Sequence, residues 1–277
     1  MNSNFWHTVA LLLPLLLVSA CTTVSTDGDF RARVSDLIKA ADNAADVDAE
    51  IRFGREVAAR YLGVVDAVEN NELQRYVSTL GGYLAQYSGR SELVFRFRVV
   101  DSPTINAYAM PGGYIFLTSG TLALMRNEAE LAGVLAHEIA HVREKHIVKA
   151  LNIRGLGSGA TLSQLASGAS DAFRVALDQA TDAALSILQA DGLQQEDEFS
   201  ADEIGLFIMV QAGYNPDAYS DFLARVSHSA GSDLAQVAQT HPSFVDRLDK
   251  IEVVKTTHGL NDLDYALLVD RFKALNP

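Results

Sequence analysis

Apolar residues recur along this chain with two different periods, and the change between them separates helical from strand-like segments. From Ile51 to Tyr87 they follow one another at spacings of three and four, which predicts helix. Between Val94 and Val100 the pattern is typical of a strand, and residues 105–109 and 114–117 predict two more short strands. Pro111-Gly112-Gly113 stands between the last two and predicts a turn. We therefore expect a small sheet early in the chain.

A helix with a well-marked start follows these strands. Asn127 can cap its first turn, and Glu130, three residues later, completes a pattern like a capping box. Its apolar stripe consists of Leu131, Val134, Leu135 and Val142. Helical periodicity returns from Ser170 to about Gln189 and from about Gln194 to Gln211. These patterns predict an α+β fold that is mostly helical.

Composition and charge narrow the range of functions. The chain has 277 residues, 48% of them hydrophobic and 21% charged, which is typical of a globular protein. Its formal net charge is -13, and the acidic residues are spread along the chain. Such a surface repels nucleic acid, so we expect no nucleic-acid partner.

The first twenty residues differ from the rest, because they contain no acidic or basic side chain. Leu11 to Val18 forms an apolar core too short to span a bilayer, as in a secretory signal. The sequence Val18-Ser19-Ala20-Cys21 resembles a bacterial lipobox, in which the cysteine is acylated and becomes the mature N-terminus. Thr22 resembles the sorting signal for the outer membrane. A plain cleaved signal or an uncleaved anchor is the alternative, since no Lys or Arg precedes the apolar core.

The lipobox-like sequence predicts that the chain has three parts. Residues 1–20 are the lipoprotein signal peptide, residues 21–50 the lipidated cysteine and its tether, and residues 51–277 the folded domain. The expected location is the bacterial outer membrane, with the lipid-anchored domain facing the periplasm.

The helix that Asn127 begins carries the sequence VLAHEIAHVREKH. His137 and His141 are one helical turn apart, so their imidazoles project from the same face and can bind one metal ion. Glu138 is turned by one position, which places its carboxylate beside the metal, where it can take a proton from a metal-bound water. The alternative is a salt-bridged helix face, because Arg143 and Glu144 follow directly.

A catalytic zinc needs a third protein ligand. The extended HExxHxxGxxH pattern is excluded because Glu144 and Ile147 stand where it requires Gly and His, and we expect His146 to be a surface histidine. On a later helix, Glu198 can bind the metal, while Asp202 one turn on accepts a hydrogen bond from a ligating histidine. The neighbouring acids Glu196 and Glu203 are expected to face away.

Four motifs occur in the order found in the CAAX prenyl protease and HtpX-like family of zinc metallopeptidases. In chain order they are NAYAMPGGYI at 106–115, HEIAHV at 137–142, EFSAD at 198–202 and THPSFVDR at 240–247. The resemblance covers roughly residues 50–255 and is greatest to the periplasmic lipoprotein branch without a helical-repeat domain. It implies a zincin fold of the gluzincin type, with the small sheet packed on the HExxH helix and one Zn²⁺ per chain.

The resemblance also draws attention to His241 and Arg247. It implies that His241 lies near the zinc, where it either steadies the oxyanion or occupies the water position and keeps the enzyme latent. As a bare sequence feature, His241 before Pro242 is a helix-capping residue. Arg247 could pair with Asp202 or with another acid.

Together these observations predict a zinc endopeptidase that hydrolyses unfolded or misassembled envelope proteins. We expect the substrate to lie extended against the strand around Asn106, Ala107, Tyr108 and Ala109, with its backbone paired to a sheet edge. The Gly- and Ser-rich segment 155–168 is expected to gate the cleft. The alternative is an outer-membrane assembly factor or chaperone whose zinc site is latent or structural. The oligomeric state does not follow from the sequence.

Overall fold

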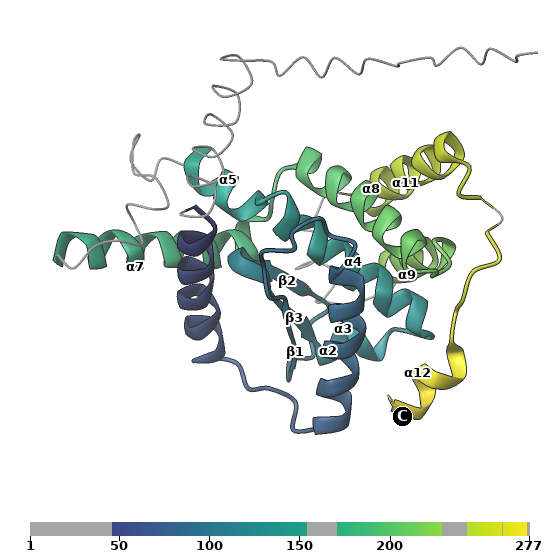
Figure 1. Cartoon of the computed structure of the whole chain (residues 1–277), viewed down its shortest axis with the longest axis horizontal. Helices are drawn as coiled ribbons and strands as arrows, with labels where there is room; N and C mark the ends of the chain where they lie inside the picture. Colours follow the sequence, from purple (N-terminus) through teal and green to yellow (C-terminus); the bar gives the residue numbers. More distant parts are fainter. Residues whose placement is uncertain (1–45, 154–170, 229–242, 262, 276–277) are drawn as a thin grey trace, which may run out of the picture. The chain divides into compact units, whose positions relative to one another are not determined.

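The computed structural model describes residues 46–153, 171–228, 243–261 and 263–275, all of which belong to one folding unit. A helix over residues 46–62 precedes the labelled elements of Figure 1. These elements are α2 (Asn71–Ala85), β1 (Arg96–Val100), β2 (Ala107–Met110), η1 (Pro111–Gly113), β3 (Tyr114–Thr118), α3 (Ser119–Ala123), α4 (Glu128–Arg143), α5 (His146–Ile153), α7 (Asp171–Ser186), η2 (Ile187–Asp191), α8 (Gln195–Gln211), α9 (Asp217–Ser227), α11 (Phe244–His258) and α12 (Val269–Leu275).

The three strands form one mixed sheet in the order β1-β3-β2. Strands β1 and β3 are parallel, with Arg96 opposite Tyr114, whereas β2 runs antiparallel to β3, with Ala107 opposite Leu117. Within the described chain, β2 is therefore an edge strand. The turn at η1 that joins β2 to β3 requires glycine, because Gly112 and Gly113 have φ angles of 72° and 90°.

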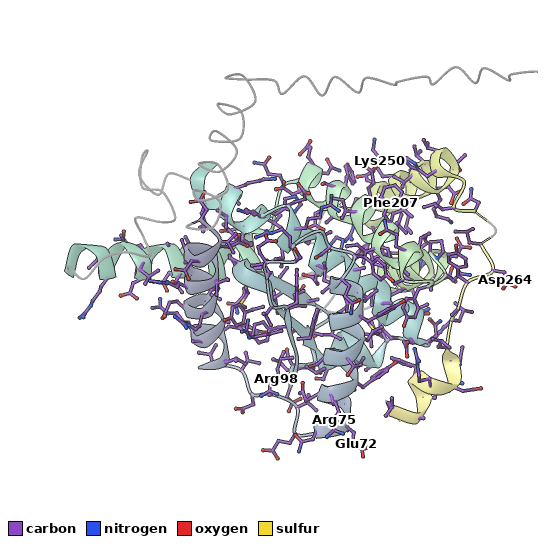
Figure 2. All side chains as sticks on the ribbon, viewed as in Figure 1. Glu72, Arg75, Arg98, Phe207, Lys250 and Asp264 are labelled. Atoms are coloured by element: carbon purple, nitrogen blue, oxygen red, sulfur yellow. The ribbon has the colours of Figure 1, made fainter. Side chains whose placement is uncertain are left out.

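The two faces of the sheet are buried against different helices, as strand alternation requires. One face, which includes Phe97, Ile115 and Leu117, packs with the buried side chains of α2 and α4. The other face, which includes Tyr108 and Phe116, packs against the helix over residues 46–62 and against α5 and α7. Side chains fill both layers, while charged residues such as Arg98 project outward (Figure 2).

Helix α4 is the central element and is buried on every side from Glu128 to Val142. Its most extensive packing is against α8, and the two backbones approach closely at Gly205. A Cβ atom at Gly205 of α8 would lie only 3.1 Å from the backbone nitrogen of His137. This close approach sets the distance between the residues that the two helices carry.

The start of α4 follows the predicted capping pattern. Asn127 Oδ1 accepts a hydrogen bond from the backbone N–H of Glu130 at 2.9 Å. The Glu130 carboxylate in turn accepts from the backbone N–H of Arg126 at 2.9 Å, one residue before the usual position in a capping box.

The helical prediction for residues 51–87 needs correction, since the structure has two helices there. The first ends near residue 62, and α2 begins only at Asn71, where Asn70 accepts hydrogen bonds from two backbone N–H groups. Between them the chain makes a turn after residue 62, and Ala67 then forms a β-bridge with Val100. Val65 and Val68 of the link are only partly buried, and Leu62 and Val64 are exposed, so the periodic apolar residues at the break do not form a helical stripe. Among the described helices, none combines the length and the apolar character of a membrane span.

Candidate metal centre

Three buried side chains from α4 and α8 converge at one point. His137 Nε2 lies 2.9 Å from His141 Nε2. Glu198 Oε2 lies 3.5 Å from His137 Nε2, and Glu198 Oε1 lies 3.4 Å from His141 Nε2. Tetrahedral zinc with ligand bonds of 2.0–2.1 Å separates its ligand atoms by about 3.3 Å. The donor set of two imidazoles and one carboxylate, and its spacing, therefore fit a zinc ion.

Asp202 fixes the orientation of the first histidine. Its Oδ1 lies 2.9 Å from His137 Nδ1, so His137 donates from Nδ1 and keeps the Nε2 lone pair for a metal. The carboxylate also accepts two hydrogen bonds from Arg247 of α11, at 2.8 Å and 2.6 Å. Tyr219 of α9 donates to the same Oδ1 at 2.9 Å. The first histidine is thus held through residues from three different helices.

These charges shift the pKa values of the network. Burial raises the pKa of Asp202, but the Arg247 charge and the hydrogen bonds from Arg247 and His137 outweigh it and lower that pKa to about 2. Burial and the Arg247 charge both lower the pKa of His137. The hydrogen bonds to Asp202 and Glu198 are stronger in sum, so the pKa of His137 is raised to about 9. A metal must displace that proton to bind.

The second histidine has a different partner. His141 Nδ1 lies 2.8 Å from His146 Nδ1, and His146 Nε2 lies 3.5 Å from Asp197 Oδ1. The expectation of a surface histidine at 146 is wrong, because only 2% of this residue is exposed. The expectation assumed that α4 continues, whereas the helix ends at Arg143 and the chain turns at Lys145, where φ is 57°.

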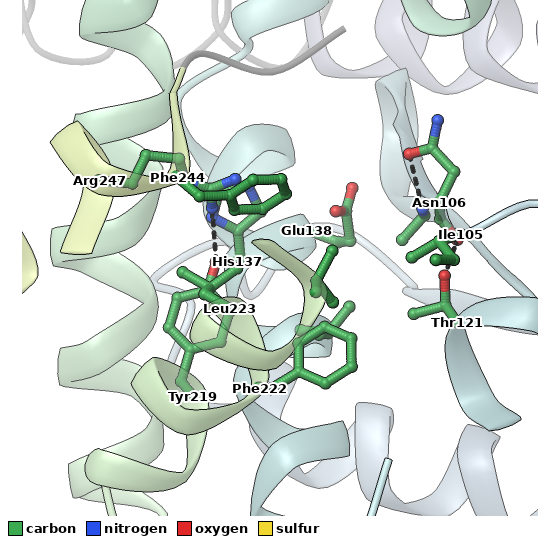
Figure 3. Close-up of a pocket in the computed structure, with 13 residues that line it drawn as sticks. Ile105, Asn106, Thr121, His137, Glu138, Tyr219, Phe222, Leu223, Phe244 and Arg247 are labelled. Atoms are coloured by element: carbon green, nitrogen blue, oxygen red, sulfur yellow. Dashed lines mark hydrogen bonds between the residues drawn. The ribbon is translucent and has the colours of Figure 1, made fainter. Parts of the chain in front are cut away.

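Glu138 points toward the space between α4 and the start of β2 (Figure 3). It lines two adjoining cavities, and Ala107 of β2 lines both. The first also has His137 and apolar side chains of α9 in its wall. The second has His141, Glu198 and the segment around η2 in its wall. One strand therefore borders the cleft on both sides of the Glu138 carboxylate.

The four residues of the expected substrate strand do not share one environment. Asn106 and Ala107 line the cleft, and Ala109 lines its second cavity. Tyr108 lies on the opposite face of the sheet, where its ring packs edge-on against Tyr61 at a centroid distance of 5.3 Å. Its side chain is therefore not among those that line the two cavities.

Other expectations fall outside the described residues or on the surface. His241, Cys21, the signal segment and the segment 155–168 all lie outside the described ranges. Glu196 and Glu203 are exposed on α8 and face away from the ligands. Sequence reasoning missed Tyr219 and His146. Tyr219 has no spacing signal relative to the motifs, and Arg143, Glu144 and Lys145 before His146 are all residues that favour helix, so no signal marked the turn there.

Several characterised proteins are similar to this chain. The beta-barrel assembly-enhancing protease of Escherichia coli (strain K12) is 28% identical over 221 residues, which cover 77% of this chain and 45% of that protein. The protein of the same name from Yersinia pestis is 28% identical over 252 residues, covering 87% of this chain and 51% of its own length. The mitochondrial metalloendopeptidase OMA1 of Schizosaccharomyces pombe is 32% identical over 182 residues, covering 64% and 51%.

The chain thus spans about half the length of the curated relatives it matches. The sequence profile of peptidase family M48 matches residues 68–255, a range that contains both histidines of α4 and Glu198. The match covers more than half of the chain, and the fold brings two histidines and one glutamate together. The chain therefore belongs to peptidase family M48, a family of zinc-dependent metallopeptidases.

Proposed function

We propose that this chain is a zinc-dependent endopeptidase that cleaves unfolded or misassembled proteins of the bacterial envelope. The observation that carries the proposal is the position of Glu138, which lies in the cleft beside the three ligands and the edge strand β2. The relatives named for beta-barrel assembly support the choice of substrate class. Acylation of Cys21 would anchor the enzyme at the outer membrane, as its lipobox-like sequence suggests.

Each residue of the centre has a part in peptide hydrolysis. His137, His141 and Glu198 would hold the zinc, and the bound ion would supply the Lewis acidity that peptide hydrolysis needs. Glu138 accepts the proton of the attacking water and then donates it to the leaving amine. Asp202 keeps His137 in the tautomer that binds metal, and Arg247 keeps Asp202 ionised.

Strand β2 positions the substrate. Its partner within the described chain is β3, so its other edge can pair with an extended substrate backbone. Ala107 and Ala109 point toward the cleft, and their small side chains let a second backbone approach Glu138. Backbone pairing does not depend on the substrate's side chains, which suits an enzyme that acts on unfolded segments. The wall of Phe222, Leu223 and Val226 favours an apolar side chain beside the cleaved bond.

The test is cleavage of a reduced and alkylated protein by the chain from Thr22 to Pro277, which keeps the whole folding unit. Glu138→Gln removes the proton acceptor and preserves the size of the side chain. We expect it to lower kcat about 10²–10⁴-fold while zinc stays bound. Glu203→Gln, an exposed site on the neighbouring helix, is the matched control and should retain activity.

Equal activity of Glu138→Gln and the unchanged protein would refute the proposed mechanism. No cleavage by either protein, with zinc bound to both, would favour a chaperone or a latent enzyme. In that case His241→Ala separates the two, because relief of latency restores cleavage only in an enzyme.

A further inference from the structure

The two histidines of the centre are supported by different chemical groups. His137 Nδ1 faces the ionised carboxylate of Asp202 at 2.9 Å, whereas His141 Nδ1 faces the imidazole of His146 at 2.8 Å. His146 is buried and lies at the first residue of α5, outside the motif that supplies the ligands. The structure thus gives one ligand a charged acceptor and the other a neutral one.

The positions of the protons follow from metal binding. When His141 binds a metal through Nε2, its remaining proton is on Nδ1, so the atom 2.8 Å away must be an acceptor. His146 then carries its own proton on Nε2, which lies 3.5 Å from Asp197 Oδ1. The chain His141 to His146 to Asp197 therefore has one direction of donation, and it selects the metal-binding tautomer of His141.

The backbone is built to bring His146 to this place. Lys145, at φ 57°, reverses the chain in a conformation that non-glycine residues rarely adopt. Its N–H donates to Val142 O at 3.1 Å, its carbonyl accepts from Lys149 N at 2.9 Å, and Arg90 Nη1 donates to Val142 O at 3.1 Å. These contacts fix the turn, so the position of His146 relative to His141 is determined by the ends of both helices.

We propose that His146 is a positioning residue that holds His141 ready to bind zinc and thereby sets the metal affinity of the centre. The inference rests on the proposed zinc site. A neutral acceptor has a specific advantage here, because Glu198 and Glu138 already place two carboxylates beside the metal. A further carboxylate on His141, besides these two and Asp202 on His137, would add negative charge and reduce the acidity that zinc confers on water.

Two substitutions of opposite design test this role in the full-length chain in detergent. His146→Asn loses ring volume but can keep an acceptor near the Nδ1 position, whereas His146→Phe fills the space and has no acceptor. We expect His146→Phe to bind Zn²⁺ about 10- to 100-fold more weakly, because removing the hydrogen-bond partner of a metal ligand lowers metal affinity by about this factor. The affinity is measured by competition with a chromogenic chelator. His146→Asn should recover most of that loss. His258→Phe, at an exposed histidine of α11, is the control.

The outcomes separate positioning from packing. If only packing matters, the phenylalanine variant binds zinc better than the asparagine variant, and the proposal is wrong. It is also wrong if both variants bind zinc like the unchanged chain, or if both are equally impaired. The absorption bands of bound Co²⁺ provide a second readout, which changes in His146→Phe only if the ligand ring has moved. Failure of the proposed zinc site itself is distinguishable, because the unchanged chain and His141→Ala would then bind Zn²⁺ equally.

Discussion

The ion pair between Asp202 and Arg247 offers the sharpest test of how the centre is held together. Arg247 is 3% exposed and donates two hydrogen bonds to a carboxylate that is itself 1% exposed. Asp202→Asn preserves the shape and an acceptor for His137 but removes the negative charge. The guanidinium is then buried without its main counterion, and breaking such a pair costs about 3–5 kcal/mol. For a domain of this size that corresponds to a fall in Tm of about 6–20 °C.

The assay is thermal unfolding of the metal-free protein by circular dichroism. Asp178→Asn is the control, since it breaks an Asp–Arg pair with Arg60 whose carboxylate side chain is 63% exposed, and exposed pairs contribute only about 0–1 kcal/mol. Because the pKa of Asp202 is lowered from 3.8 to about 2, its ionised form stabilises the fold fully above pH 3.8, and this contribution disappears as pH falls through about 2. The difference between Asp202→Asn and the unchanged protein should shrink over that interval. Equal effects of the two substitutions at pH 7 would refute the reasoning.

Two further predictions concern proton competition and helix packing. In the metal-free protein the raised pKa of His137 stabilises the fold fully below pH 6.5, and this contribution is lost as pH rises through about 9. Zinc displaces the same proton, so chelator competition should show affinity rising about tenfold per pH unit between pH 7 and pH 9, and a flat profile would contradict it. Gly205→Ala should destabilise the protein by about 1–3 kcal/mol and weaken zinc binding, because its Cβ would press on the His137 backbone. The control is Gly82→Ala, which has no atom within 4 Å of the new Cβ and should stabilise the protein by about 0.5–1 kcal/mol in denaturant unfolding. If both substitutions stabilised the protein, helix propensity would outweigh the close contact at Gly205.

Features that depend on residues close together in the chain could be predicted from the sequence. The spacing of His137 and His141 fixes their common face, because a helix of 3.6 residues per turn leaves no alternative. The cap at Asn127 was equally predictable, since it depends only on residues three apart. The zinc cofactor and the fold expected from the four motifs agree with the family match and with the grouping of His137, His141 and Glu198.

Relations between distant segments could not be predicted in the same way. Tyr219 and Asp202 are 17 residues apart and on different helices, and the packing of both α8 and α9 against α4 brings them together. His146 was misplaced because one residue, Lys145, adopts a left-handed conformation that the sequence does not signal. The break between residues 62 and 71 was missed because Val65 and Val68 of the link continue the apolar spacing, although they are only partly buried and Val64 is exposed.

The burial of α4 on all sides has a consequence for how this protein loses activity. An amphipathic surface helix can open locally, but no side of α4 from Glu128 to Val142 is free to separate from its neighbours without exposing the core. Its amide protons should therefore exchange with solvent only through global unfolding. Glu138 and both histidine ligands are on this helix, so heat inactivation should follow a single cooperative transition that coincides with the loss of secondary structure.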